Sequence, residues 1–269
     1  MKVLIVYGQM EHWHNFKTDC LLPYFNGKVN AIKIFTNTQL LKNYLNSEGK
    51  WHQNYVIPLN EGFLYELRQA NITCMMPQTD IVNIFCDKSR FLFYVVMNHL
   101  EAYYPKSYIN PHPHENKLVI VKPHWGGNSQ GCYTANLKDL GAEVFKKNIA
   151  QDYIKASREY AGYGVAKHGK IIYSFAYIRD YGDKVYIKGD ASDNTTQHRI
   201  EMDPNHKVIL EKFLMPVKFT GAFCADYKIF NNQLIVFEIN ARLGGSLAAP
   251  YNRNDAAAII SHTIDAYHG

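Results

Sequence analysis

The 269-residue sequence has few cysteines and no pattern that would pair them. Its five cysteines are an odd number, lie far apart and form no C-x-x-C motif, which favours free thiols in a reducing compartment. No apolar run approaches the roughly 18 residues of a membrane-spanning helix, and the apolar part of the opening MKVLIVYGQM is too short for a signal sequence. We therefore predict a cytoplasmic protein with no membrane partner.

Charge of one sign is also scarce. The 29 basic and 24 acidic residues give a net charge of only +5, and there is no basic tail or block. This distribution argues against nucleic acid as a partner, and the 20 tyrosines do not form a base-stacking platform without a basic stripe. Internal repeats and low-complexity tracts are absent as well, and a composition of 47% hydrophobic and 20% charged residues is typical of a globular enzyme.

The N-terminal third alternates between strand-like and helix-like segments. Short β-branched or aromatic runs occur at 2–7, 31–35 and 54–58, and helix-like stretches occur at 36–45 and 60–69. Strands that alternate with helices indicate a parallel sheet with helices on its faces. We expect a small doubly wound α/β unit here.

The chain changes character near residue 105. One amphipathic helix is expected at 87–105, and a proline-rich connector follows it at 106–116. Strands dominate from residue 117 onward, which indicates α+β structure. We predict an N-terminal domain at 1–110 and a second domain at 111–269.

A glycine-rich loop follows the strand that ends in Lys122, within the segment VKPHWGGNSQGCY. Three glycines, Gly126, Gly127 and Gly131, allow backbone N–H groups to turn toward an anion, and the lysine supplies a charge for phosphate oxygens. Neither the P-loop spacing nor a G-x-G-x-x-G pattern is present. Taken alone, the segment is also compatible with an ordinary hairpin turn.

A hairpin of two alternating strands is predicted around the turn at 231–232. Side chains two residues apart share a strand face, so Glu238, Asn240 and Arg242 would line up while Phe237 faces the core. A carboxylate, a carboxamide oxygen and a guanidinium suit a magnesium ion beside a transferred phosphate. A surface hairpin with solvated charges is the alternative.

The length of the hairpin loop decides whether Asp226 joins this face. A two-residue turn would put Asp226 opposite Phe237, whereas a three-residue loop at 231–233 would put it opposite Glu238. Two facing carboxylates are destabilising unless a cation lies between them. We predict the three-residue loop and a metal site.

Two weaker signals lie between these motifs. In QDYIKASREYAGYGV, at 151–165, a strand end is followed by a short link and then by Glu159 on a second strand. Backbone groups of such a link can pair with an adenine edge, and the carboxylate can accept from ribose hydroxyls; a plain connector is the simpler interpretation. Arg179 ends a long strand. The sequence is equally compatible with a side chain that contacts substrate or γ-phosphate and with a side chain that is simply solvated.

Taken in chain order, these motifs resemble the ATP-grasp superfamily across residues 87–246. The run EINARLGG is similar to the EvNpR segment of the carbamoyl-phosphate synthetase and biotin carboxylase branch. The resemblance implies a pre-ATP-grasp α/β unit followed by a two-lobed ATP-grasp fold with its hinge near 151–155. Asp226 stands where that branch often has Glu, Ala241 replaces a frequent Pro, and no biotin or glutaminase domain is present.

The resemblance further implies ATP and Mg²⁺ as cofactors and assigns roles by position. Two lysines and the loop at 125–131 would contact the phosphates, and the segment at 151–154 would contact the adenine. The hairpin face would contact the metal and the acyl phosphate. The implied cofactor-binding residues are Lys88, Lys122, Gly126, Gly127, Ser129, Gly131, Gln151, Tyr153, Ile154 and Glu159. The implied metal ligands are Asp226, Glu238 and Asn240, and the implied catalytic residues are Lys122, Arg179 and Arg242.

The activity that the resemblance implies is ATP-dependent ligation through an acyl phosphate. The partners would be a small-molecule carboxylate and an amine or thiol nucleophile. Two alternatives stay open, an ATP-binding regulatory module without ligase activity and a small-molecule kinase. The identity of the substrates and the oligomeric state also stay open, with a homodimer as one alternative.

Overall fold

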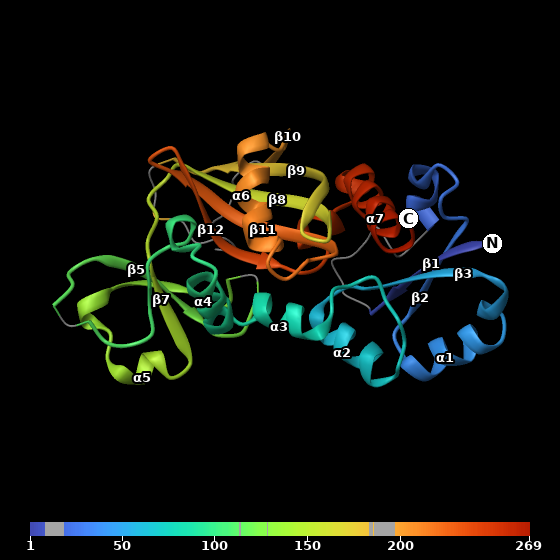
Figure 1. Ribbon diagram of the computed structural model, residues 1–269, viewed down its shortest axis with the longest axis horizontal. Helices are drawn as coiled ribbons and strands as arrows, with labels where there is room; N and C mark the ends of the chain where they lie inside the picture. The colour runs from blue at the N-terminus through green and yellow to red at the C-terminus, as the bar shows by residue number, and fades with distance from the viewer. Residues whose placement is uncertain (9–18, 113, 128, 183–184, 186–196) are drawn as a thin grey trace.

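The described residues form three β-sheets that lie in a row in the computed structural model (Figure 1). The structure describes residues 1–8, 19–112, 114–127, 129–182, 185 and 197–269. A parallel N-terminal sheet occupies one end, a four-stranded sheet the other end, and a five-stranded sheet lies between them (Figure 1). This mixed α/β and α+β architecture confirms the expected fold class.

The N-terminal sheet is parallel, with the strand order β2-β1-β3. Its central strand is buried because both of its faces are covered, as in a doubly wound sheet. Helix α2 begins after Asn60, whose side chain accepts a hydrogen bond from the backbone N–H of Phe63. The elements of this unit are β1 (Lys2–Tyr7), η2 (Asp19–Phe25), β2 (Ala31–Phe35), α1 (Thr38–Asn46), η3 (Gly49–Trp51), β3 (Gln53–Pro58) and α2 (Glu61–Gln69).

Two helices lead from this unit to the next sheet, α3 (Thr79–Cys86) and α4 (Lys88–Met97). Asp87 caps α4 by accepting from the backbone N–H groups of Ser89 and Arg90. The expected helix at 87–105 is too long, because His99 adopts a left-handed conformation with φ of 56° and ends the regular helix. A short helix η4 (Glu101–Tyr103) follows.

The four-stranded sheet forms a small lobe with the order β4-β7-β5-β6. It has a hydrophobic core of its own, which includes Tyr108, Val119, Val121 and Leu137. Its elements are β4 (Ser107–Tyr108), β5 (Leu118–Pro123), β6 (Tyr133–Asn136), η5 (Leu137–Asp139), α5 (Ala142–Phe145) and β7 (Asn148–Asp152).

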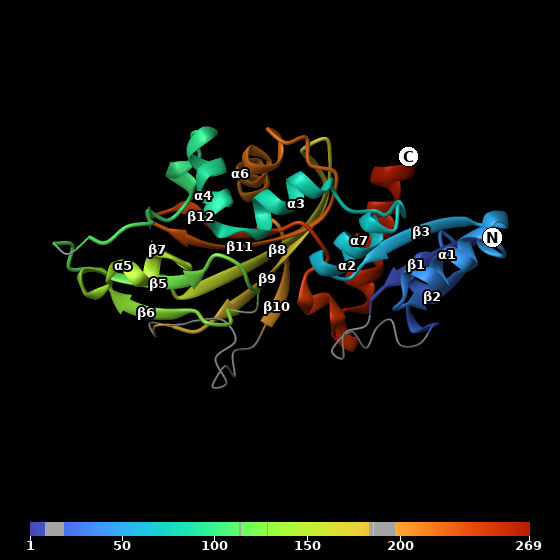
Figure 2. The same cartoon turned by 90° about the horizontal axis from the view of Figure 1, so that it is seen from below.

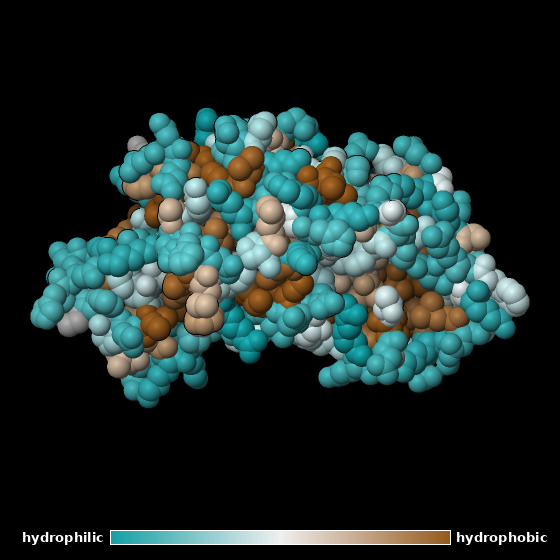
Figure 3. Space-filling model, in the orientation of Figure 1, coloured by the Kyte–Doolittle hydropathy of each residue, from teal (hydrophilic) through white to brown (hydrophobic). Residues whose placement is uncertain are grey.

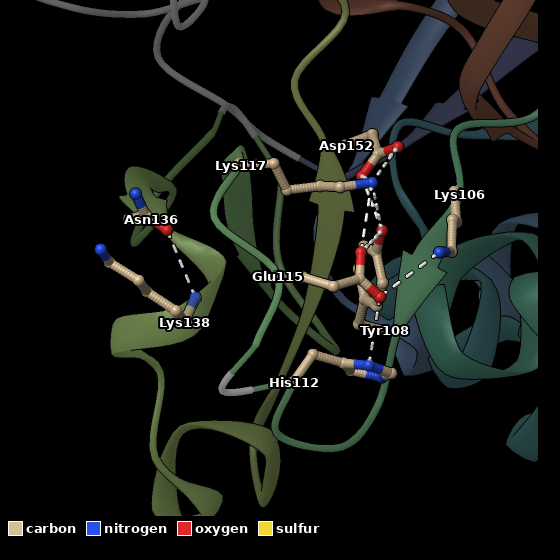
Figure 4. A network of polar contacts seen from close by, with 8 residues as sticks. All are labelled: Lys106, Tyr108, His112, Glu115, Lys117, Asn136, Lys138 and Asp152. Carbon is tan, nitrogen blue, oxygen red and sulfur yellow. Dashed lines mark hydrogen bonds and ion pairs between the residues drawn. The ribbon is translucent and has the colours of Figure 1, made fainter.

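A polar network on the small lobe ties the connector to β7 (Figure 4). Lys117 Nζ donates to the Tyr108 hydroxyl at 2.8 Å and lies 3.3 Å from Asp152, and that hydroxyl donates to Asp152 at 2.9 Å. The hydrogen bond to Tyr108, with Asp152 beside it, raises the pKa of Lys117. Glu115 extends the network to Lys106 at 3.5 Å. The network fixes the end of β7, where the chain leaves the small lobe.

The five-stranded sheet is antiparallel, with the order β10-β9-β8-β11-β12. Figure 2 shows α3, α4 and α6 on one side of this sheet and the small lobe on the other. Its two large hydrophobic clusters both continue into the N-terminal unit, and α7 packs against β8 and η2. Its elements are β8 (Arg158–Lys167), β9 (Lys170–Asp180), β10 (Gln197–Glu201), α6 (Pro204–Leu214), β11 (Gly221–Phe230), β12 (Gln233–Asn240), η6 (Gly245–Ala248), η7 (Pro250–Asn252) and α7 (Arg253–His268).

The β11–β12 hairpin contains a β-bulge. The turn has two residues, Asn231 and Asn232, with φ of 49° and 60°, the left-handed conformations that such a tight turn needs. The pairing then shifts between Asp226 and Tyr227, so that Asp226 lies opposite Glu238. The expected pairing is therefore confirmed, but the three-residue loop is wrong, because the extra residue sits in the strand instead.

The surface that faces the viewer in Figure 3 is mostly hydrophilic, with hydrophobic residues visible mainly in recesses between elements. Among the described residues, no helix is long and apolar enough to span a membrane.

Candidate functional site

A pocket lies between the small lobe and the five-stranded sheet. It encloses about 760 Å³, including its open mouth. Residues that the sequence singled out from five separate segments meet in its wall. These wall residues are Lys88, Lys122, Gly126, Gly127, Ser129, Gln151, Tyr153, Ile154, Glu159, Asp226 and Glu238. The wall does not include Gly131, Arg179, Asn240 or Arg242.

Two lysines converge beside the glycine-rich loop. Lys122 lies on β5 and is 8% exposed, and Lys88 is the first residue of α4. Lys88 Nζ donates to the backbone carbonyl of Gly126 at 3.0 Å, which ties the loop to the helix. Burial lowers the pKa of Lys122, and the nearby charge of Glu238 partly opposes this shift. The two side chains can supply positive charge to an anion held under the loop.

Glycine is required by backbone conformation at two positions of this loop. Gly126 has φ of 138° and Gly131 has φ of 73°, and both values lie in the left-handed region that other residues rarely adopt. Gly131 also packs against Pro123, since a Cβ there would lie 3.1 Å from the proline ring. Residue 128 lies outside the described part of the loop, so the expected phosphate-binding loop at 125–131 is described only on either side of that position.

Two carboxylates face one another at the opposite wall. Asp226 on β11 lies opposite Glu238 on β12, and Asn240 Nδ2 donates to Glu238 Oε1 at 3.2 Å. No group of three or more His, Cys, Asp or Glu side chains in the described part of the chain could hold a metal ion by itself. The pair nevertheless fits Mg²⁺, which is commonly held by one or two carboxylates together with phosphate oxygens.

Arg242 lies beside this pair and is held from the N-terminal unit. Its Nε donates to Glu61 Oε1 at 2.8 Å, and its terminal nitrogens donate to the Leu243 carbonyl at 2.9 Å and to Asn240 Oδ1 at 3.5 Å. Burial alone would lower the pKa of Arg242, but Glu61 reverses the effect and the pKa is raised. Glu61 was not among the residues predicted for the site. Its position at the carboxyl end of a parallel strand was the available signal, because ligand contacts gather there.

Gln151 offers a buried acceptor at the other end of the pocket. Its Nε2 donates to Ser107 Oγ at 3.1 Å, and that hydroxyl donates to the Pro105 carbonyl at 2.9 Å, which fixes the orientation of the amide. Its Oε1 is buried without a hydrogen-bond partner. An unsatisfied buried acceptor is costly. A ligand with an amino donor, such as the exocyclic amine of adenine, fits this position.

Among the wall residues that were not predicted, two lie close in sequence to Asp226 and Glu238. Lys228 is only 3% exposed, and its Nζ donates to the Ile154 carbonyl at 3.3 Å. It lies two residues after Asp226 on one strand, so the alternation of β11 was a sufficient signal. Phe237 lines the pocket with its ring 5.3 Å from Lys122 Nζ and 5.6 Å from Lys228 Nζ. The expectation that Phe237 faces the core is wrong, because the bulge turns it to the face of Glu238.

Arg179 lies at the edge of the same sheet face. It is directly opposite Glu159 in the β8–β9 ladder and donates to Gln197 Oε1 through two nitrogens, at 3.0 and 3.2 Å. It is therefore close to the pocket without forming part of its wall.

Residues 87–246, more than half of the chain, match the family described as the ATP-grasp domain. The chain belongs to the ATP-grasp family. The resemblance seen in the motifs is thus confirmed, and the matched residues include every predicted site residue. No curated protein matches this ATP-grasp chain.

Solved structures share the whole ATP-grasp architecture at low sequence identity. D-alanine–D-alanine ligase from Bacillus anthracis is similar with a TM-score of 0.63 and 13% identity, covering 99% of this chain and 95% of that one. L-amino acid ligase from Bacillus licheniformis has a TM-score of 0.60 and 14% identity, covering 98% and 74%. Biotin carboxylase from Campylobacter jejuni has a TM-score of 0.64 and 11% identity, covering 98% and 70%. At these identities the similarity shows the fold.

Proposed function

We propose that this protein is an ATP-dependent ligase that joins a small-molecule carboxylate to an amine through an acyl phosphate. The observation that carries the proposal is the convergence of two buried lysines, two facing carboxylates and a buried unsatisfied acceptor in one pocket. These groups match the phosphates, the metal and the adenine of Mg-ATP respectively. The names of the structural neighbours, two of which are amino acid ligases, support the same reaction class.

The nucleotide assignments follow the length of the pocket. We assign Lys88 and Lys122 to the phosphates, and Glu159 to the ribose. The hinge segment at 151–154 would receive the base, with the Gln151 oxygen accepting from the exocyclic amine. The remaining phosphate contacts would come from Gly126, Gly127, Ser129 and Gly131, and the remaining base contacts from Tyr153 and Ile154.

Asp226 and Glu238, with Asn240 beside them, would hold magnesium together with phosphate oxygens. The ion would offset negative charge on the transferred phosphoryl group. A related carboxylase domain has been crystallised with MgADP, which supports this choice of metal for the fold.

The reaction has two steps. A carboxylate oxygen of the substrate attacks the γ-phosphorus of ATP and ADP leaves, and the amine then attacks the acyl carbon and expels phosphate. Lys122 places positive charge at the phosphates in the first step, where positioning and electrostatics supply most of the catalysis. Arg242 would bind the negative tetrahedral intermediate in the second step, and the glycine-rich loop would exclude water between the two steps. Arg179 is proposed to contact the substrate or the γ-phosphate from the neighbouring strand.

Arg242 favours ligation over simple ATP binding. Its side chain is 19% exposed and is held by Glu61 just outside the pocket wall, where a terminal nitrogen lies 3.5 Å from Asn240 Oδ1. Nucleotide binding alone needs no such group, whereas acyl transfer does. A thiol nucleophile, a kinase and a binding module remain the alternatives that the experiment separates.

Product analysis tests the proposal directly. The protein is incubated with Mg-ATP and mixtures of amino acids and small carboxylic acids, and products are measured by mass spectrometry. We expect a product with the summed mass of two substrates less one water, together with equal amounts of ADP and phosphate. A phosphorylated acid as the final product would indicate a kinase, and ATP binding without consumption would indicate a binding module.

A matched pair of variants accompanies this experiment. Arg242→Met should keep ATP binding and lose product, because the guanidinium acts on the acyl group. Arg158→Met should retain both, since Arg158 is an exposed residue that pairs with Asp180 on the surface. Loss of product in both variants would show that the assay reports stability instead of chemistry.

Three further proposals concern organisation. We keep the boundary between an N-terminal domain and the ATP-grasp domain near residue 110, with the hinge at 151–155. We propose a cytoplasmic location on the basis of the free thiols of the described cysteines Cys74, Cys86, Cys132 and Cys224. A homodimer is proposed because Phe93, Val96 and Met97 leave exposed apolar side chains on one helix, and light scattering after size exclusion would test it.

A further inference from the structure

A buried lysine occupies the nucleoside end of the pocket. Lys228 Nζ donates to the Ile154 carbonyl at 3.3 Å, in the hinge segment, and lies 3.9 Å from Glu159 Oε2. Both partners lie in the pocket wall, and Lys228 and Glu159 are 3% and 9% exposed. One ammonium group therefore contacts the segment assigned to the base and the carboxylate assigned to the ribose.

The surroundings of this ammonium compensate for its burial. The rings of Tyr153, Tyr181 and Phe237 have their centroids 5.2, 5.0 and 5.6 Å from Nζ. Aromatic faces at this range attract a cation, and more strongly where water is excluded. Burial lowers the pKa of Lys228, and the charge of Glu159 opposes that shift. The lysine is thus held in place from several directions.

Glu159 is flanked by cations on both sides of its strand. Arg179 lies directly opposite it on β9, and continuing the β11–β8 ladder by one residue places Lys228 opposite it on β11. Burying a carboxylate is costly unless an opposite charge lies close to it. At 3.9 Å, Lys228 lies beyond hydrogen-bond distance from Glu159, so it offsets the charge without occupying an oxygen lone pair. An ionised carboxylate is what two ribose hydroxyls need as an acceptor.

We propose that Lys228 is a positioning residue that gives this site its selectivity for the ribose hydroxyls. It offsets the charge of the buried Glu159 carboxylate from 3.9 Å, and it fixes the hinge by donating to the Ile154 carbonyl. The inference rests on the proposed function, in which Glu159 faces the ribose of ATP. The pocket lysines then have separate tasks, because Lys88 and Lys122 serve the phosphates and Lys228 serves the nucleoside.

The test compares two nucleotides that differ only in the ribose. Calorimetric titrations use Mg-ATP and Mg-2′,3′-dideoxy-ATP, which lacks both hydroxyls. The parent should bind ATP at least about tenfold more tightly, as expected for hydrogen bonds to a charged acceptor. Glu159→Gln should reduce this ratio below about threefold, and Lys228→Met should reduce it to a similar value.

Two lysine variants serve as controls. Lys122→Met should weaken both nucleotides by the same factor and leave their ratio at the parental value, because it removes a phosphate contact. Lys138→Met should change neither affinity, since Lys138 is an exposed residue outside the pocket. The ratio of affinities therefore separates a ribose effect from a general loss of binding.

Several results would overturn the inference. If Lys228→Met weakened both nucleotides equally and kept the parental ratio, Lys228 would have only a structural role. Should that variant fail to fold, Lys228→Gln keeps a donor for the Ile154 carbonyl without the charge, and a parental ratio in that variant would have the same meaning. Equal binding of the two nucleotides by the parent overturns this inference alone, whereas no ATP binding overturns the proposed function with it. Selective ATP binding without ligation would contradict only the proposed function.

Discussion

The ion pair between Glu61 and Arg242 is expected to stabilise the fold as well as the site. It joins the first turn of α2 to the residue two positions after β12, at 2.8 Å, with side chains 21% and 19% exposed. Glu61→Ala leaves the mostly buried guanidinium with the Leu243 carbonyl and Asn240 as its hydrogen-bond partners. Removing one partner of a buried pair costs 3–5 kcal/mol, and the partial exposure here places the expected loss at about 3 kcal/mol.

Urea denaturation measures this loss as the change in the free energy of unfolding. Asp180→Ala is the matched control, because it breaks a 2.7 Å ion pair with Arg158 whose side chains are 57% and 44% exposed. An exposed pair of this kind should contribute less than about 1 kcal/mol. The double variant of Glu61→Ala with Arg242→Met should cost less than the sum of the single variants by about 2 kcal/mol, because no charge is then left buried. Equal losses for Glu61→Ala and Asp180→Ala, or additive single losses, would refute the reasoning.

The other predictions concern the phosphates, the loop and the metal. Lys122→Met should weaken ATP binding about 10- to 100-fold by calorimetry with the fold intact, as for the loss of a charged hydrogen bond, and unchanged binding would refute the phosphate role. Because burial lowers the pKa of Lys122, the ATP affinity of the parent should begin to fall at a pH below the ordinary lysine pKa of about 10.4. A fall in affinity only above that pH would contradict this prediction. Gly126→Ala should weaken ATP binding more than Gly127→Ala, since only Gly126 has a positive φ, and equal effects in parallel titrations would count against the loop conformation. Asp226→Asn should raise the magnesium concentration needed for half-maximal ATP consumption, and an unchanged magnesium titration would remove Asp226 from the metal site.

The β11–β12 hairpin shows why the sequence predicts which residues are paired more easily than it predicts the loop length or bulge that pairs them. The requirement that two carboxylates share one cation correctly placed Asp226 opposite Glu238. The turn at 231–232 nevertheless follows local backbone preferences, because asparagine tolerates the left-handed conformation. A bulge at Phe237 allows both the two-residue turn and the pairing of Asp226 with Glu238. The only sign of this bulge in the sequence is that the turn and the pairing require different registers.

Residues that depend on contacts between distant segments were harder to predict. The strands of the N-terminal sheet and the motif residues followed from local periodicity and chain order. Glu61 and Lys228 lack such a pattern, because their roles arise from contacts with Arg242, 181 residues away, and with Ile154, 74 residues away. The early end of α4 was missed for a local reason, since the left-handed conformation that His99 adopts is uncommon for residues other than glycine.

The separate core of the small lobe makes that lobe an inserted module. The chain enters it at β4 and leaves it at β7, and these strands are paired, with Ser107 opposite Gln151. The two ends of the insertion are therefore about 5 Å apart, the spacing of neighbouring strands. A short linker could replace residues 107–152 without cutting either of the clusters that join the N-terminal unit to the large lobe. The nucleotide pocket would lose one wall, but the remainder would keep its hydrophobic clusters and fold. A different lobe, with a different ligand preference, could then be grafted onto it.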